Sequence, residues 1–172
     1  MNLQEHIRDI PDWPKPGIVF KDITPLLASP AGLAMAVERM VNPFRGHGVE
    51  MVAGAESRGF IFGTALAQAL SAGFIPIRKP NKLPAETHAI SYALEYGSDT
   101  LEIHADALKR GQRVLMVDDL LATGGTMKAC CELVDQLGGE ILGVTVLIEL
   151  AFLDGRQRLK PYDHNIHAVL KY

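Results

Sequence analysis

The sequence has little of three things that mark whole classes of protein: cysteine, excess positive charge and long apolar runs. Its two cysteines, Cys130 and Cys131, are neighbours, which excludes a disulfide framework or a CxxC metal clip. We therefore expect a reduced, cytoplasmic protein. No run of 18 apolar residues is present, and the polar first residues have no signal-peptide core, so we expect no membrane association. A net charge of -3 argues against a general nucleic-acid partner.

Several nucleotide-binding and metal motifs are also missing. The chain has no GxxxxGK[ST] loop, no GxGxxG after a strand and no HExxH pair. Glu102 and His104 alternate on an expected strand without a third ligand, so we interpret them as structural. The sequence therefore does not predict a Walker-type nucleotide site, a dinucleotide fold or a zinc enzyme.

What is present is the pattern of one α/β domain covering residues 1–172, of which 48% are hydrophobic. Apolar strands are expected at 49–55, 74–79, 113–120, 140–150 and 165–172. Helices are expected at 58–70, at 126–137 and from Pro30 onward, with Ser29 as the N-cap of the last. This alternation predicts a mostly parallel, twisted sheet flanked by helices.

Two further segments stand apart from that alternation. Residues 10–27 contain four prolines and predict an extended arm, within an N-terminal region of about residues 1–28. Residues 90–97 and 100–108 alternate apolar and polar side chains, as in a β-hairpin, with its turn near 97–99.

The stretch "RVLMVDDLLATGGT" (113–126) carries the clearest chemical signal. Asp118 and Asp119 end a buried strand, and a loop of small residues then leads into a helix N-terminus, which suits a phosphate. Carboxylates repel phosphate but accept hydrogen bonds from hydroxyls beside it. The pattern therefore predicts a site for a sugar phosphate such as ribose 5-phosphate. The alternative is a tight strand-to-helix turn in which the acids only cap.

This stretch resembles the phosphoribosyl-pyrophosphate motif of the type I phosphoribosyltransferase family. The segments that resemble the adenine-using members cover nearly the whole chain: "PDWPKPGIVFKDITPLL", "ESRGFIFG", "RKPNKLP", "SYALEYG" and "LEIHADAL". The resemblance implies the family's fold, with a small N-terminal hood and a mobile hairpin lid. It also implies a homodimer that converts adenine and phosphoribosyl pyrophosphate to AMP and pyrophosphate. Mg²⁺ is expected as cofactor, held mainly by substrate and water with no direct protein ligand.

The resemblance also implies residue roles. The residues expected to bind the ribose hydroxyls and the 5-phosphate are Asp118, Asp119, Ala122, Thr123, Gly124, Gly125 and Thr126. Those expected at the pyrophosphate, in part from the partner subunit, are Ser57, Arg58, Arg78, Lys79, Lys82 and Tyr96. An arginine fork suits two phosphate oxygens. From the residues alone, Arg58 could equally be a surface arginine at a helix start and the other basic residues a solvated loop.

Other residues are candidates for binding the adenine base and for assisting proton transfer. The resemblance implies that Phe20 stacks on adenine while the backbone of Val19 and Lys21 reads its edge; without it, Phe20 would be interpreted as a core residue. It also implies that Glu95, on the lid, contacts the base and assists proton transfer as the sugar passes through an oxocarbenium-like state. The alternative for Glu95 is a solvated turn residue.

Two rival functions stay open at this stage. One is an enzyme of the same fold that uses hypoxanthine, guanine, xanthine or orotate, which the arm disfavours. The other is a regulator that binds phosphoribosyl pyrophosphate without catalysis. Such regulators carry a DNA-binding module, for which this chain has no spare length.

Overall fold

The computed structural model describes residues 1–94 and 96–172. The chain divides into two compact units, Met1–Arg39 and Met40–Tyr172, and each is described by itself. The larger unit carries the parallel sheet and the phosphate-loop motif, so it is the unit in which a sugar-phosphate site can be examined.

The N-terminal unit is a hairpin followed by helices. It begins with the 3-10 turn η1 (Leu3–His6), then strands β1 (Arg8–Pro11) and β2 (Val19–Asp22) pair antiparallel, and α1 (Thr24–Ala28) and α2 (Pro30–Val41) follow. The expectation of an extended arm is wrong at 24–28. Pro25 lies in the first turn of α1, where its missing N–H costs no helical hydrogen bond. The predicted cap is confirmed, because the Gly32 N–H donates to Ser29 Oγ at 3.1 Å.

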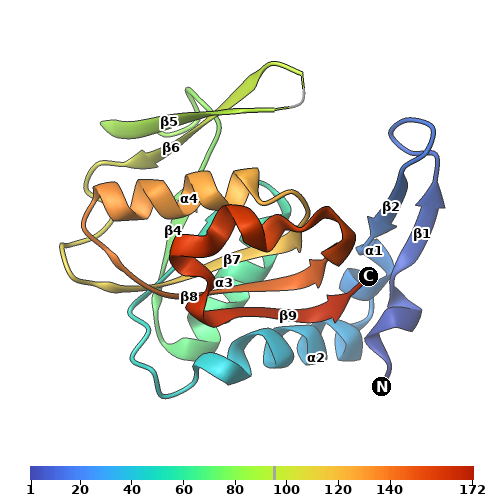
Figure 1. Cartoon of the computed structure of the whole chain (residues 1–172). Coiled ribbons are helices and arrows are strands. Elements are labelled where there is room, and N and C mark those ends of the chain that lie inside the picture. The colour runs from blue at the N-terminus through green and yellow to red at the C-terminus, as the bar shows by residue number, and fades with distance from the viewer. Residues whose placement is uncertain (95) are drawn as a thin grey trace. The chain divides into compact units, whose positions relative to one another are not determined.

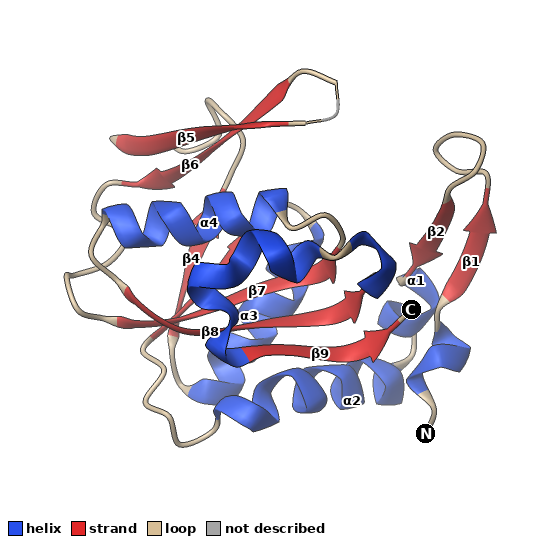
Figure 2. Ribbon diagram, in the orientation of Figure 1, coloured by secondary structure: helices blue, strands red, loops and turns tan. Residues whose placement is uncertain are grey.

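The larger unit is built on a five-stranded parallel sheet with the order β4-β3-β7-β8-β9 (Figure 1). Its strands are β3 (Met51–Ala55), β4 (Gly73–Ile77), β7 (Arg113–Leu121), β8 (Glu140–Glu149) and β9 (Ile166–Lys171). The helical elements are η2 (Asn42–Phe44), α3 (Arg58–Leu70), α4 (Gly125–Gln136), η3 (Ala151–Leu153) and η4 (Gly155–Asn165) (Figure 2). The predicted α/β fold with a parallel sheet is thereby confirmed.

Alternate residues of the central strands face opposite sides of the sheet. Ala53 and Met116 belong to one buried cluster with Cys130 of α4. A Cβ on Gly54 would instead contact the Val117 side chain at 3.1 Å and the carbonyl oxygen of Gly59, in α3, at 3.3 Å. Helices therefore cover both faces, and the carboxyl ends of the strands are the edge left for a ligand.

The predicted hairpin is also present, as β5 (Thr87–Ala93) and β6 (Ser98–His104). Its turn lies slightly earlier than expected: the Leu94 N–H donates to Gly97 O, and Asp99 already pairs with Tyr92 in the ladder. The hairpin lies along α4 in Figure 1, and a β-bridge between Arg78 and Glu102 joins β6 to the chain just after β4. In the described part of the chain, no helix is long and apolar enough to cross a membrane.

Candidate active site

A cavity of about 430 Å³ opens at the carboxyl ends of β3 and β7. The predicted residues that line it are Ser57, Arg58, Lys79, Asp118, Asp119, Ala122, Thr123, Gly124, Gly125 and Thr126. The sequence motif at 118–126 and half of the predicted pyrophosphate residues are therefore brought together, although they come from different parts of the chain.

The bottom of the cavity is the loop that leads into α4. Gly124 adopts a left-handed conformation with φ 87°, and as a glycine it has no side chain to cap the first N–H groups of the helix. Those groups and the exposed hydroxyls of Thr123 and Thr126 form the donor set that an anion at a helix N-terminus requires. The loop is therefore suited to a phosphate group.

The same loop rests on a second glycine that the sequence analysis missed. A Cβ on Gly124 would overlap the carbonyl oxygen of Gly155, and a Cβ on Gly155 would overlap the carbonyl oxygen of Ala122. Gly155 begins η4, an element that was not predicted because most of its eleven residues are polar and they include Pro161. The backbone of η4 thus supports the phosphate loop from behind.

The two acids lie side by side at the end of β7. Asp119 is buried and its Oδ2 accepts a hydrogen bond from Arg58 Nε at 2.6 Å, while Asp118 Oδ1 accepts from the Asp119 N–H at 2.8 Å. Burial, followed by the neighbouring Asp119 charge, raises the pKa of Asp118 well above its usual value. Both acids line the cavity, and their side-chain oxygens can accept hydrogen bonds from ligand hydroxyls.

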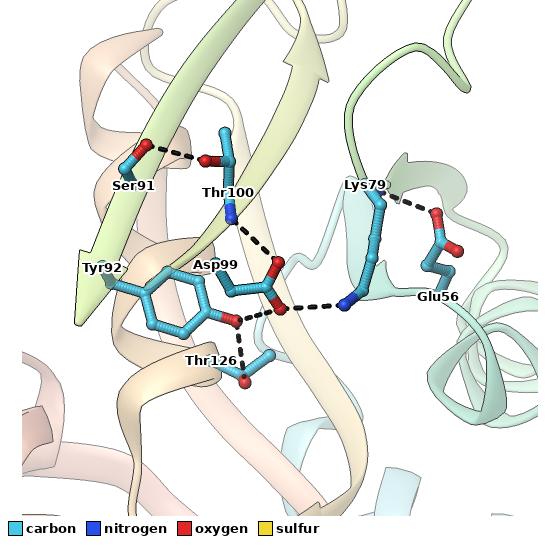
Figure 3. A network of polar contacts seen from close by, with 7 residues as sticks. All are labelled: Glu56, Lys79, Ser91, Tyr92, Asp99, Thr100 and Thr126. Carbon is cyan, nitrogen blue, oxygen red and sulfur yellow. Dashed lines mark hydrogen bonds and ion pairs between the residues drawn. The ribbon is translucent and has the colours of Figure 1, made fainter. Parts of the chain in front are cut away.

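A network of polar contacts forms the opposite side of the cavity (Figure 3). Lys79 Nζ pairs with Asp99 Oδ2 at 2.8 Å, and the Lys79 N–H donates to Glu56 Oε1 at 2.8 Å. Tyr92 OH lies 3.4 Å from Asp99 Oδ2 and 3.2 Å from Thr126 Oγ1. Tyr92, Asp99 and Glu56 line the cavity and were missed. The hairpin pattern could have indicated the first two, since they are paired across the ladder.

Other predicted pyrophosphate residues do not line this cavity. Arg78 Nε pairs with Glu56 Oε1 at 3.2 Å, and its guanidinium carbon lies 5.9 Å from the centre of the Phe60 ring. Lys82 is exposed, and 81% of the Tyr96 surface is exposed. Glu95 lies outside the described residues. The pyrophosphate roles of Arg78, Lys82 and Tyr96 and the proton-transfer role of Glu95 stay predictions.

The predicted base-binding residues lie on β2 of the N-terminal unit. Phe20 packs edge-on against Trp13 with ring centroids 4.5 Å apart, and both line a pocket of about 220 Å³. Val19 is half exposed, and Lys21 Nζ pairs with Asp9 Oδ1 at 2.7 Å. Phe20 is only partly buried, so it has room for a flat apolar partner. Its role in binding adenine stays a prediction.

Comparison with known proteins places this site in a family. The model of the phosphoribosyl transferase domain matches residues 26–171. An adenine phosphoribosyltransferase of Rhodopirellula baltica is 58% identical over 172 residues, covering 100% of this chain and 82% of that protein. The chain belongs to the adenine phosphoribosyltransferase family. The expected family membership is therefore confirmed.

Solved structures of phosphoribosyltransferases agree with this fold. An adenine phosphoribosyltransferase from Thermoanaerobacter pseudethanolicus superposes with a TM-score of 0.95 at 49% identity, covering 99% of this chain and 100% of the other. The enzyme of Saccharomyces cerevisiae, complexed with adenine and an imino-altritol bisphosphate, gives 0.90 at 38% identity and covers 98% and 96%. The type I phosphoribosyltransferase architecture is thus shared over nearly the whole chain.

The donor set at the cavity can be tested against the expected Mg²⁺. In the described residues there is no group of three or more His, Cys, Asp or Glu side chains that could hold a metal ion. Mg²⁺ prefers oxygen ligands, keeps several waters and is commonly held by one or two carboxylates plus substrate phosphates. Asp118 and Asp119 are carboxylates facing the cavity, so the site fits an ion that arrives with a phosphorylated substrate.

Proposed function

We propose that the protein is an adenine phosphoribosyltransferase that joins adenine to phosphoribosyl pyrophosphate, giving AMP and pyrophosphate for purine salvage. One observation carries the proposal: an amide- and hydroxyl-rich loop, the adjacent acids Asp118 and Asp119, and the cationic side chains of Arg58 and Lys79 line a single cavity. These three groups match, in order, the 5-phosphate, the ribose hydroxyls and the pyrophosphate of that substrate. The relatives at 58% and 49% identity bear the same enzyme name.

The 5-phosphate would bind the loop 122–126, where the helix N-terminus and the threonine hydroxyls stabilise its charge. Asp118 and Asp119 would then accept hydrogen bonds from the two ribose hydroxyls. Asp119 is already tied to Arg58, so the same arginine lies between the sugar and the leaving group. This arrangement fixes the anomeric carbon and lowers the entropic part of the barrier.

The leaving pyrophosphate would be stabilised by Arg58, Lys79 and Ser57, with Arg78, Lys82 and Tyr96 as further predicted contacts. Positive charge placed where negative charge develops is the kind of stabilisation that contributes most to many enzymes. When bound, Mg²⁺ would neutralise part of the pyrophosphate charge. Adenine would stack on Phe20 with the backbone of Val19 and Lys21 at its edge, and Glu95 would take up the proton released from the purine.

The direct test is to measure AMP formation from adenine and phosphoribosyl pyrophosphate, in reactions with and without Mg²⁺, by chromatography of the products. We expect turnover that depends on Mg²⁺ and a specificity constant for adenine far above that for hypoxanthine. Hypoxanthine presents an acceptor where adenine presents a donor, and such a mismatch costs about 1–3 kcal/mol. Equal use of the two bases would overturn the adenine assignment and favour the rival purine enzymes.

The non-catalytic alternative is separated by the same experiment. A regulator would bind phosphoribosyl pyrophosphate in a titration but form no AMP with any base. The homodimer, the cytoplasmic location and the mobility of the hairpin also stay predictions. Sedimentation of the purified protein would test the dimer.

A further inference from the structure

The hairpin places a carboxylate inside the cavity. Asp99 is the second residue of β6, and its side chain is three-quarters buried at the cavity wall. Oδ2 of Asp99 accepts a hydrogen bond from Lys79 Nζ at 2.8 Å, and Oδ1 accepts one from the Thr100 N–H at 2.9 Å (Figure 3). The charged end of Lys79 is therefore already occupied by an anion that belongs to the protein.

Both members of this pair are charged at neutral pH. The hydrogen bond from Lys79 lowers the pKa of Asp99, and the same bond raises the pKa of Lys79. Asp99 thus places a full negative charge against the Lys79 ammonium, at the position that the proposed function assigns to the pyrophosphate.

We propose that Asp99 is an internal competitor for the pyrophosphate of the substrate: its carboxylate occupies the Lys79 ammonium, and the incoming pyrophosphate must displace it. The inference rests on the proposed function, because it uses Lys79 as a pyrophosphate ligand. Asp99 thereby sets the affinity for the activated sugar and eases release of the pyrophosphate product.

The backbone geometry supports an exchange of partners at the ammonium alone. The N–H of Lys79 is held by Glu56 Oε1 at 2.8 Å, and Glu56 also pairs with Arg78. The main chain at Lys79 is therefore anchored independently of Asp99. Only the flexible end of the lysine has to turn from one anion to another.

Tyr92 connects Asp99 to the loop that is expected to bind the 5-phosphate, because its hydroxyl contacts both Asp99 and Thr126. Its single hydroxyl proton can go to Asp99 Oδ2 at 3.4 Å or to Thr126 Oγ1 at 3.2 Å. If Thr126 donates its own proton to a 5-phosphate, it remains an acceptor for Tyr92. Phosphate binding therefore draws the Tyr92 proton away from Asp99, so occupation at either end of the cavity weakens the contacts of Asp99.

The test compares the parent with Asp99→Asn, which keeps the size of the side chain and an acceptor for Thr100 but removes the charge. Titration with inorganic pyrophosphate and with phosphoribosyl pyrophosphate, both with Mg²⁺, should show binding tightened about two- to tenfold. The KM for phosphoribosyl pyrophosphate should fall while kcat does not rise. The gain should shrink at high salt, because the charge is partly exposed.

A matched control is Glu50→Gln, which removes one negative charge from the pair with Arg113 where β3 and β7 begin, at the opposite edge of the sheet. It should leave pyrophosphate affinity unchanged. In a Lys79→Ala background, the gain from Asp99→Asn should be much smaller, because the shared cation is gone. A structural role for Asp99 would lower the affinity on substitution, whereas competition raises it.

Weaker or unchanged pyrophosphate binding in Asp99→Asn would overturn the inference, as would an equal gain with and without Lys79. A parent protein that does not bind inorganic pyrophosphate would overturn it as well. A further outcome is that the parent protein binds pyrophosphate and Asp99→Asn tightens that binding, while neither protein makes AMP. This result would support Asp99 as a competitor and overturn only the proposed catalysis.

Discussion

The cavity has two sides that are built in different ways. We call residues 118–126, from the end of β7 to the start of α4, together with Gly155 behind them the floor, and the side chains of Lys79, Tyr92 and Asp99 the wall. The floor is mainly main chain, locked by two glycines in mutual contact. The wall is made of side-chain hydrogen bonds between a hairpin and its surroundings (Figure 3).

The two constructions differ in whether their contacts can be exchanged for others. Main-chain contacts between packed elements leave no alternative partner, so the floor is preorganised for its phosphate. Each wall contact joins groups that can find another partner, and Lys79 is half exposed. We therefore expect substitutions in the floor to cost much more than those in the wall.

The largest effect is expected from the acids of the floor. The double variant Asp118→Ala, Asp119→Ala should weaken phosphoribosyl pyrophosphate binding by about 3–6 kcal/mol, since it removes both acceptors and each lost hydrogen bond to a charged group is worth about 1.5–3 kcal/mol. Titration calorimetry measures this directly. An unchanged affinity would remove both residues from the ribose site.

Gly124→Ala should come next. The added Cβ would overlap Gly155 O, and the left-handed φ adds strain, so the phosphate loop must shift. A displacement of about 1 Å in a binding loop can lower turnover about a hundredfold. AMP formation and thermal unfolding should be measured together.

Gly111→Ala is the matched control for that substitution. Gly111 has φ 84° but nothing lies within 4 Å of a Cβ built there, so it carries the strain without the overlap. It should lower the unfolding free energy by about 1 kcal/mol and leave turnover near the parent value. Equal losses of turnover in both variants would mean that strain, and not support from η4, explains the floor.

Glu149→Gln should have a moderate effect on stability. Arg156 binds both carboxylate oxygens of buried Glu149, at 2.7 and 2.8 Å, and thereby ties the start of η4 to β8. Because Arg156 is about a third exposed, we expect a loss of only about 1–2 kcal/mol in unfolding free energy. The surface Lys128–Glu132 pair, within one helix, is the control, and Glu132→Gln should cost below about 0.5 kcal/mol.

The effect of Glu149→Gln should also depend on pH. The Arg156 hydrogen bonds lower the pKa of Glu149 in the folded protein. The contribution of Glu149 to stability is therefore complete above its pKa in the unfolded chain, about 4.3, and is lost as the pH falls through its pKa in the folded protein. Denaturant unfolding of parent and variant should therefore differ at neutral pH and converge under acid conditions. A constant difference at all pH values would contradict the ion pair as its source.

Residues 118–126 of the floor were predicted from the sequence, whereas Tyr92 and Asp99 of the wall were not. Asp118 to Thr126 are contiguous, so an apolar strand, two acids and a glycine loop place them without any tertiary information. Asp99 and Tyr92 meet Lys79 and Thr126 only after the hairpin packs beside α4. Gly155 was missed for the same reason, because its partner is a backbone oxygen 33 positions earlier, at Ala122.

The N-terminal unit shows a different limit of sequence reading. Four prolines within 10–27 predicted an extended arm, yet Pro25 starts a short helix because the first turn of a helix needs no N–H there. Proline density therefore predicted extended backbone, as β2 has, but neither the antiparallel pairing of β1 with β2 nor the helix that follows them. Ser29 was predictable, since a serine before a proline is a local cap signal.

The smallest effect is expected from Tyr92→Phe, which removes one hydroxyl from the wall and leaves the main chain of the floor intact. Net hydrogen bonds of this kind are worth about 0.5–1.5 kcal/mol, and both contacts here are long, at 3.2 and 3.4 Å. Burial also raises the pKa of Tyr92, so the hydroxyl is protonated across the working range and no pH dependence should follow from it. We expect kcat/KM for phosphoribosyl pyrophosphate to change by no more than about threefold, and amide hydrogen exchange in β5 to rise. A loss approaching that of Gly124→Ala would show that the wall is as preorganised as the floor, and the division between them would fail.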